Sequence, residues 1–266
     1  MTRVAVVGHV EWVEFVRVDH VPVPGEIVHA SETWQEPAGG GAVAAVQLAR
    51  LAGECLFLTA LGDDELGHKA ARGLRELGVR VEAAWRSEPQ RRAFVHLDAR
   101  AERTITVIGD RMGAHGEDAL PWDELGDVEA VYFTAGDVEA LRRARAARSL
   151  VATTRANEAL VPGHVQLDVL VRSARDPGEQ YVELDPAPRY IAQTDGAFGG
   201  SLLESDGSTT RWESAPLPRP AVDAYGAGDS FAAGLTFGLA KDLPAQEAVV
   251  EGARCGAEAM TRRGAY

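Results

Sequence analysis

The stretch VDAYGAGDSFAAGL, residues 222–235, sets three small residues and an acid before an apolar run. The apolar run predicts a buried helix, so residues 226–229 would form the N-terminus of that helix. Unpaired backbone N–H groups point outward from a helix N-terminus, and the helix dipole adds partial positive charge there. Without bulky side chains such a turn admits a phosphate, and the carboxylate of Asp229 can take a proton from an attacking hydroxyl. Alternatively, Asp229 only caps the helix and the glycines only form a turn.

The composition favours one large folded domain that handles a small molecule. The chain has 266 residues, 45% of them apolar, and a formal net charge of −13. A field of that sign argues against nucleic acid as a partner, although local donors can still hold an anionic substrate. No run approaches the roughly 18 apolar residues of a membrane span, and the first residues lack the apolar stretch of a signal peptide. We expect a cytoplasmic protein with no membrane partner, whose two cysteines are reduced and buried.

The first third of the chain alternates strands and helices. Residues 3–10 and 55–62 predict buried strands, because both are rich in large apolar side chains. A glycine-rich turn opens an Ala-rich helix that ends at Gly53, and an acidic start predicts a second helix over residues 63–78. Strand, helix, strand, helix is the pattern of a parallel sheet.

Residues 79–108 interrupt that pattern. Residues 92–98 and 104–108 predict a hairpin around a turn at 99–103, and the alternating segment 11–21 predicts another strand. Together these segments predict a small separate sheet. Later in the chain we expect strands over 130–136, 150–155, 167–173, 180–184 and 190–196, helices over 137–150 and 244–264, and a hairpin over 201–214.

The longer motif around Asp229 resembles the C-terminal signature of the ribokinase family, also called the PfkB carbohydrate kinases. The motif is DAYGAGDSFAAG, residues 223–234. In order along the chain, residues 38–67 resemble the N-terminal signature of that family, TDGAFGG (194–200) resembles its nucleotide loop, and TRRGA (261–265) resembles the close of its adenine-side helix. The resemblance covers nearly all of residues 3–265.

This resemblance implies a fold and an activity. We expect a doubly wound α/β fold, with a mostly parallel sheet flanked by helices, as a single domain over residues 1–266. The small β-sheet would be its lid, formed by about 11–36 and 82–108. The implied reaction is transfer of the γ-phosphoryl group of ATP to a hydroxyl of a small sugar-like molecule, helped by Mg²⁺.

The resemblance also implies roles for individual residues. Asp229 would be the base that activates the hydroxyl, and the backbone N–H groups of Gly226, Ala227 and Gly228 would form the anion hole. The residues expected beside the nucleotide are Thr194, Gly196, Gly199 and Ala253.

The substrate side departs from the family pattern. Glu11 falls where the family has an Asn that holds sugar hydroxyls, and Val13 falls where it has an Asp. Ala44 stands in place of a further Asn after the glycine pair. We still expect Glu11, Gly40 and Gly41 at the substrate, but ribose itself is disfavoured because polar contacts are lost. A sugar, a cyclitol and a nucleoside remain alternative acceptors.

Metal binding is a further expectation. The family motif Asn-x-x-Glu, which organises Mg²⁺ and phosphates, aligns with residues 173–176, where Asp176 keeps a carboxylate on a shorter arm. Relatives activated by K⁺ use backbone groups around and beyond the last residues of this chain, so a K⁺ site stays open.

Two alternatives concern the protein as a whole. A catalytically weak binding or regulatory protein would keep the fold while tolerating the changed substrate positions. A homodimer joined through the lid would cover the apolar side chains of the small sheet, among them Phe15 and Phe94.

Overall fold

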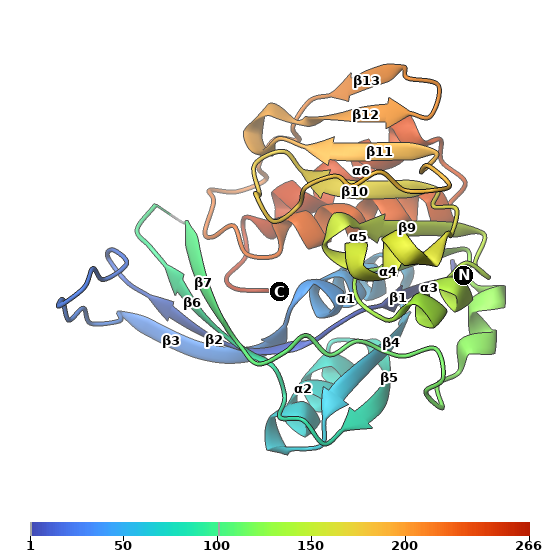
Figure 1. The fold of residues 1–266 in the computed structure, drawn as a ribbon. Helices are drawn as coiled ribbons and strands as arrows, with labels where there is room; N and C mark the ends of the chain where they lie inside the picture. Colours follow the sequence, from blue (N-terminus) through green and yellow to red (C-terminus); the bar gives the residue numbers. More distant parts are fainter. Residues whose placement is uncertain (1, 101) are drawn as a thin grey trace.

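Two β-sheets are present in the computed structural model, which describes residues 2–100 and 102–266. Within that part of the chain the larger sheet has nine strands in the order β13-β12-β11-β10-β9-β8-β1-β4-β5 (Figure 1). They are β1 (Val4–Val7), β4 (Cys55–Gly62), β5 (Val79–Arg86), β8 (Ala130–Phe133), β9 (Ser149–Thr153), β10 (Val169–Ser173), β11 (Tyr190–Thr194), β12 (Gly200–Glu204) and β13 (Thr209–Trp212). Only β11–β12 and β12–β13 pair antiparallel, so the predicted, mostly parallel sheet is confirmed.

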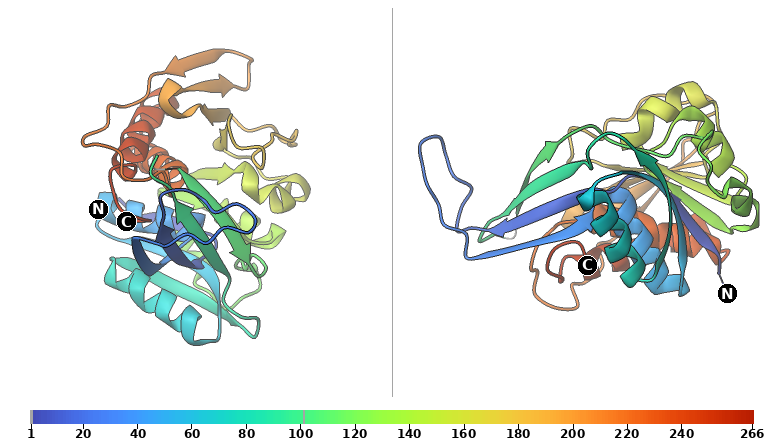
Figure 2. Two further views of the ribbon diagram at one scale, coloured as in Figure 1. Left: turned by 90° about the vertical axis from the view of Figure 1, so that its left-hand side faces the viewer. Right: turned by 90° about the horizontal axis from the view of Figure 1, so that it is seen from below.

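Helices cover both faces of this sheet, as the right-hand view of Figure 2 shows. One face carries α1 (Gly40–Ala52), α2 (Glu65–Glu76), α5 (Ala227–Ala240) and α6 (Ala245–Ala259), which share one apolar core with the strands. The other face carries α3 (Val138–Ala144), α4 (Asn157–Gly163) and the 3-10 helix η1 (Trp122–Asp127) around a second core. Two shorter 3-10 helices are η2 (Thr154–Ala156) and η3 (Gly196–Phe198). The predicted doubly wound α/β fold is therefore confirmed.

The smaller sheet projects from the carboxyl end of β1, on the left of Figure 1. Its strand order is β3-β2-β6-β7, formed by β2 (Glu11–Arg17), β3 (Glu32–Ala38), β6 (Arg92–Leu97) and β7 (Arg103–Ile108). The inner face is apolar and is covered by the same chain: Phe15 is fully buried, stacks on Trp34 with ring centroids 4.9 Å apart, and meets the edge of Tyr225 at 5.0 Å. A second molecule is not needed to bury Phe15.

The structure differs from the sequence-based expectations in two segments. Residues 79–86 are not part of the small sheet but form β5, which pairs with β4 along its whole length; the second segment of the small sheet starts at Arg92 instead of 82. Residues 180–184 form no strand, because β9 and β11 already occupy both edges of β10. The predicted hairpin of β6 and β7 is present, while residue 101 of its predicted turn lies outside the described residues.

The helices of the described chain are short, and α6 with 15 residues is the longest of them. Within this part of the chain, no helix has the length and apolar character needed to cross a membrane. Cys55 and Cys255 are buried free thiols, as expected.

Candidate active site

The predicted helix after Asp229 is α5, and its first turn faces the first turn of α1. Gly226 is the N-cap of α5 with a left-handed φ of 72°, a conformation that favours glycine. The backbone N–H of Gly39, the N-cap of α1, donates to the hydroxyl oxygen of Tyr225 at 3.2 Å. This contact brings together the two glycine-rich turns, which lie 186 residues apart in the sequence.

The N-terminus of α5 is open to a ligand. A Cβ atom built on Gly228 would meet nothing within 4 Å, and Gly228 is exposed. Gly226 is buried, since its Cβ would lie only 2.9 Å from a methyl of Val43, and Ala227 is half-buried between them. The first N–H groups of a helix have no intrahelical acceptor, so this turn presents free donors on an unobstructed side.

Asp229 lies in the first turn of α5 and is half-buried. Its side chain does not cap the helix, because Gly226 takes the N-cap position and no side-chain hydrogen bond caps it. A Cβ on Gly40 would lie 2.7 Å from Asp229 Oδ1, so only glycine leaves room for the carboxylate there. Burial, followed by the nearby charge of Glu179, raises the pKa of Asp229 to about 6.

On the substrate side, Glu11 is buried at the start of β2, and its carboxylate is paired with Arg91. Its Oε1 accepts a hydrogen bond from Arg91 Nε at 2.7 Å and lies 3.9 Å from His9 Nε2. Burial lowers the pKa of His9, and nearby arginine charges lower it further, so the imidazole is neutral. Those arginines are Arg91, Arg111 and Arg155.

The two glycines predicted at the substrate, Gly40 and Gly41, lie in different surroundings. Gly40 lies between His9 and the Asp229 carboxylate, whereas a Cβ on Gly41 would stand 2.7 Å from the His9 backbone. Gly41 therefore allows α1 to approach β1 and does not face the open site.

Val13 and Ala44, the apolar residues at two positions where the family has polar ones, also lie in different parts of the structure. Val13 belongs to the cluster under the small sheet, together with Val43, while Ala44 is buried in the core of the main domain. Adjacent helix residues point about 100° apart, so Val43 is the residue of α1 that faces the small sheet. Ala44, which we expect in place of the family Asn, lies instead in the core of the main domain.

The predicted nucleotide loop joins β11 to β12. Thr194 ends β11, and Gly196 and Gly199 have φ angles of 54° and 78°. A Cβ on Gly199 would lie 2.1 Å from the carbonyl oxygen of Trp212, so the turn also requires glycine for packing against β13. Ala253 lies on α6, partly buried against the main core. The positive φ angles favour glycine at both positions, and the side chain of Arg175 lies against the loop, where its Nε donates to Asp195 Oδ1 at 2.8 Å.

The predicted metal residue Asp176 is bound to an arginine. Its carboxylate pairs with Arg155, whose Nε also donates to Glu179 Oε1 at 2.9 Å. Glu179 accepts the N–H of Ser173 at 2.7 Å, and its negative charge is the main cause, after burial, of the raised pKa of Asp229. In residues 2–100 and 102–266 no three His, Cys, Asp or Glu side chains are grouped as metal ligands. Mg²⁺ is commonly held by one or two carboxylates with phosphates and water, so Asp176 and Glu179 fit that ion.

Sequence reasoning did not find five residues of this site: His9, Arg91, Arg111, Arg155 and Glu179. They come from five separate segments, and no motif links them. A buried histidine after a Val-rich strand was the only local signal available.

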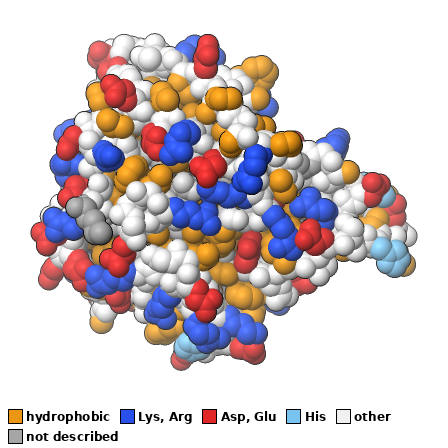
Figure 3. Space-filling view, turned by 180° about the vertical axis from the view of Figure 1, so that it is seen from behind, with side chains coloured by type: hydrophobic (Ala, Val, Ile, Leu, Met, Phe, Trp, Pro, Cys, Tyr) orange, Lys and Arg blue, Asp and Glu red, His pale blue; other side chains and the backbone are white. Residues whose placement is uncertain are grey.

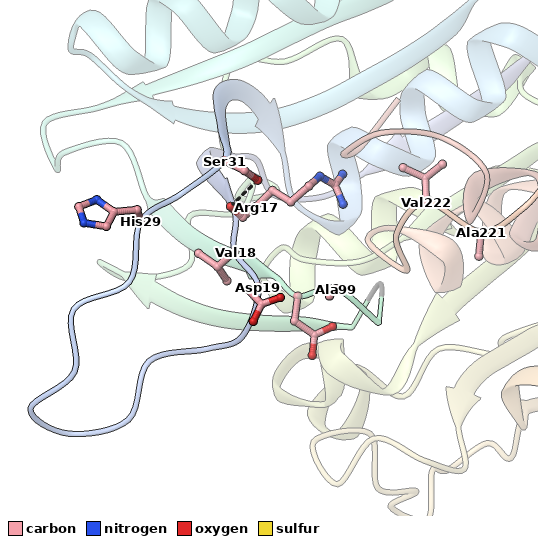
Figure 4. A pocket seen from close by; sticks show the side chains of 9 residues that line it. Arg17, Val18, Asp19, His29, Ser31, Ala99, Ala221 and Val222 are labelled. Atoms are coloured by element: carbon pink, nitrogen blue, oxygen red, sulfur yellow. Dashed lines mark hydrogen bonds between the residues drawn. The ribbon is translucent and has the colours of Figure 1, made fainter.

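A surface hollow lies away from this site, at the far end of the small sheet (Figure 4). It is lined by Arg17, Asp19, His29 and Val222 among others, and Ser31 there donates to the carbonyl of Arg17 at 3.3 Å. The hollow does not include Asp229 or any other predicted site residue.

A doubly wound sheet, a small second sheet and an acid at an open helix N-terminus define a class of α/β kinases. The sequence model of the pfkB family carbohydrate kinases matches residues 1–170 and 179–266. The chain belongs to this family. The match omits residues 171–178, the segment that carries Asp176.

Two curated relatives match most of the chain. The ATP-dependent ribose-1-phosphate kinase of Halopiger xanaduensis is 29% identical over 292 residues, covering 100% of this chain and 94% of the relative. The aminoimidazole riboside kinase of Salmonella typhimurium is 28% identical, covering 86% of this chain and 83% of the relative.

Solved structures support the same fold. The ribokinase of Thermotoga maritima superposes with a TM-score of 0.76 at 22% identity, covering 100% of this chain and 95% of that one. The Arabidopsis thaliana ribokinase complexed with ribose and ATP gives 0.75 at 19% identity, covering 99% and 94%. The predicted activity class is confirmed by family membership: ATP-dependent phosphoryl transfer to a hydroxyl of a sugar-like molecule.

Proposed function

We propose that Asp229 is the general base of this kinase and that the N-terminus of α5 is its anion hole. The observation that carries the proposal is the position of Asp229. Its carboxylate is half-buried, has no capping role, and stands across from Gly40 at the root of the small sheet. A base with a pKa of about 6 is ionised at neutral pH and can still accept a proton.

The step follows from these positions. The acceptor hydroxyl loses its proton to the Asp229 carboxylate as its oxygen bonds to the γ-phosphorus of ATP. The bond from that phosphorus to the β,γ-bridging oxygen breaks, and ADP leaves. The free N–H groups at Gly226, Ala227 and Gly228 stabilise charge on the moving phosphoryl group.

Nucleotide and metal have separate sites in this proposal. ATP lies along the loop of Thr194, Gly196 and Gly199, toward Ala253. Asp176 and Glu179 would hold Mg²⁺, which supplies charge neutralisation at the β- and γ-phosphates when bound.

The acceptor lies between Asp229 and the small sheet. Val13 and Val43 pack as buried apolar side chains under the small sheet, while Glu11 and His9 supply polar groups beside Gly39. The relatives are named for a phosphorylated acceptor, ribose 1-phosphate, and for a neutral one, aminoimidazole riboside. Both contain a ribofuranose unit, so we propose a furanose as the core of the acceptor.

Release of ADP from ATP and Mg²⁺ tests the proposal, with furanoses, their phosphates, nucleosides and cyclitols as acceptors and with or without K⁺. We expect turnover on a furanose that requires both the acceptor and Asp229. Tight binding of a furanose without any ADP release would instead support the alternative of a binding protein that has lost turnover.

A further inference from the structure

Tyr225 links the two glycine-rich turns of the candidate active site. It directly precedes Gly226, the N-cap of α5, and its hydroxyl oxygen accepts the backbone N–H of Gly39, the N-cap of α1, at 3.2 Å. The two turns leave little free space between them, since a Cβ on Gly40 would lie 2.7 Å from Asp229 Oδ1. The Tyr225 hydroxyl therefore helps to set the distance between the α1 turn and the carboxylate of Asp229.

The backbone around Tyr225 is held from two directions. The N–H of Tyr225 donates to Asp223 Oδ1 at 2.9 Å, and the other oxygen of that buried carboxylate accepts the N–H of Gly264 at 2.8 Å. From the small sheet, Arg103 Nη1 donates to the carbonyl oxygen of Ala224 at 3.2 Å. The side chain of Tyr225 thus projects from a fixed backbone toward the α1 turn.

The ring of Tyr225 is held by the small sheet, which protrudes from the main body to the right in Figure 3. Phe15 of β2 meets this ring edge to face, with ring centroids 5.0 Å apart and planes at 80°. Phe15 also stacks on Trp34 of β3, and the guanidinium of Arg263 lies 3.9 Å from the centre of the Trp34 ring. Edge-to-face contacts are directional, so a shift of β2 would turn the Tyr225 ring and move its hydroxyl relative to Gly39.

The hydroxyl of Tyr225 is neutral under ordinary assay conditions. Burial raises the pKa of Tyr225, and the nearby charge of Glu11 raises it further, so the phenol keeps its proton. A neutral hydroxyl can accept the N–H of Gly39, and this contact does not change with pH as the charge of Asp229 does.

We propose that Tyr225 is a positioning residue for phosphoryl transfer. Its hydroxyl holds the α1 turn at the distance from Asp229 that transfer requires, and its ring makes that distance depend on the position of the small sheet. This inference rests on the proposed function, which places the acceptor between Asp229 and the small sheet. Phosphoryl transfer depends on positioning more than on covalent chemistry, so a small displacement of one turn lowers the rate strongly.

Hydrogen exchange of the Gly39 amide, followed by NMR on the full chain, tests the link without turnover. Tyr225→Phe keeps the ring and removes only the acceptor of the Gly39 N–H, so this amide should exchange about tenfold faster than in the wild type. Tyr266→Phe is the matched control, because the buried hydroxyl of Tyr266 lies in the same cluster and has no hydrogen-bond partner among the described residues. Unchanged exchange in Tyr225→Phe, or an equal change in both variants, would overturn the positioning role.

Kinetics separate positioning from packing. With the furanose that gives the highest turnover in the acceptor screen, kcat of Tyr225→Phe should fall about tenfold, while the KM for ATP stays within about twofold. The melting temperature should fall by no more than about 4 °C, and the pH at which kcat/KM rises should not move. A kcat within about twofold of the wild type would mean that Tyr225 only fills space under the small sheet.

A double mutant tests the part played by the small sheet. Phe15→Leu keeps an apolar side chain but removes the edge contact, and we expect it to lower kcat about threefold. If Phe15 acts through the Tyr225 hydroxyl, the same substitution should have almost no further effect on kcat in Tyr225→Phe. Losses that multiply independently would reject the coupling.

The exchange experiment also separates this inference from the proposed function. If no acceptor in the screen is phosphorylated, the proposed function fails. Exchange at Gly39 in the wild type, Tyr225→Phe and Phe15→Leu then still decides whether Tyr225 ties the small sheet to the α1 turn. Fast exchange at Gly39 in the wild type would overturn the link even if Tyr225→Phe did not fold.

Discussion

At the scale of single residues, Asp229 combines two properties that usually exclude each other. It is a charged group in a partly buried place, and no hydrogen bond compensates its carboxylate in the described structure. Burial and the charge of Glu179 disfavour its ionised form, so the same environment that raises the pKa weakens the folded state at neutral pH.

Asp229→Asn should therefore separate activity from stability. We expect turnover to fall about 10²- to 10⁴-fold, because the amide cannot accept the proton. The variant should melt at a higher temperature than the wild type at pH 8. The folded pKa is raised from 3.8 to about 6, so the penalty of the charged form is present above about pH 6 and disappears as pH falls below 4. Steady-state assays and melting curves at pH 4 and pH 8 measure both effects. Turnover within about threefold of the wild type would contradict a catalytic role.

The pH dependence of kcat/KM should reflect the pKa of Asp229. We expect a rise through about pH 6, as Asp229 loses its proton in the free enzyme. Glu179→Gln removes a negative charge near Asp229 and leaves the positive charge of Arg155 without this partner. Both changes lower the pKa of Asp229, so the rise in kcat/KM should move to lower pH. Asp123→Asn, an exposed carboxylate on η1, is the control. If kcat/KM of Glu179→Gln rises at the same pH as that of the wild type, a group other than Asp229 controls the pH dependence.

At the scale of elements, the N-terminus of α5 is a donor site because nothing packs over it. The left-handed Gly226 turns the chain into the helix, and the first turn is left without side-chain cover at Gly228. A change at the donor site should leave the helix folded, because α5 is anchored by its buried residues against α1 and α6.

Gly228→Val should impair turnover more than folding. A Cβ at residue 228 meets no protein atom within 4 Å, so we expect the melting temperature to change by little, while the branched side chain occupies the approach to the free N–H groups. Loss of one such donor costs about 10²- to 10³-fold in comparable sites. Turnover and affinity for a non-hydrolysable ATP analogue are measured beside Gly126→Val, another open glycine. Unchanged values for both would remove the anion-hole assignment.

At the scale of the whole molecule, the small sheet closes onto its own chain. Phe15 packs between Trp34 and Tyr225, so replacing it by Asp would unfold local packing and would not report on an interface. The apolar side chains left exposed on the small sheet lie on β7, at Ile105, Val107 and Ile108.

A homodimer through the small sheet remains a prediction, and β7 is the strand that tests it. We expect light scattering at micromolar concentration to give twice the chain mass of 28.4 kDa. Ile105→Asp should return the monomer mass, because an unpaired charge buried in an interface is costly. Thr104→Asp, on the opposite face of β7, is the control. A wild-type mass near that of one chain would contradict the dimer.

Local patterns accounted for much of the fold. The alternation of apolar strands with glycine-ended helices predicts the parallel sheet, and the run after Asp229 predicts α5 with its open turn, because these features depend on neighbours in sequence. Two segments were misplaced. Residues 79–86 form a strand because they pair with β4, whereas residues 180–184 have no strand to pair with, since both sides of β10 are occupied. Which strands are free to pair is known only once the sheet is assembled.

Local sequence patterns predicted the helix start at residues 226–229 with an acid beside it, and the resemblance of its motifs to the family predicted the class of reaction. Only the tertiary structure decided that Val43, one residue before Ala44, faces the small sheet, and that Arg91 neutralises Glu11. It also decided that Arg111, which forms no ion pair in the described chain, donates to the backbone carbonyl of Arg155. Capping and periodicity act over a few residues and can therefore be predicted from local sequence. The charge balance of a site is set by side chains that folding brings together from distant segments.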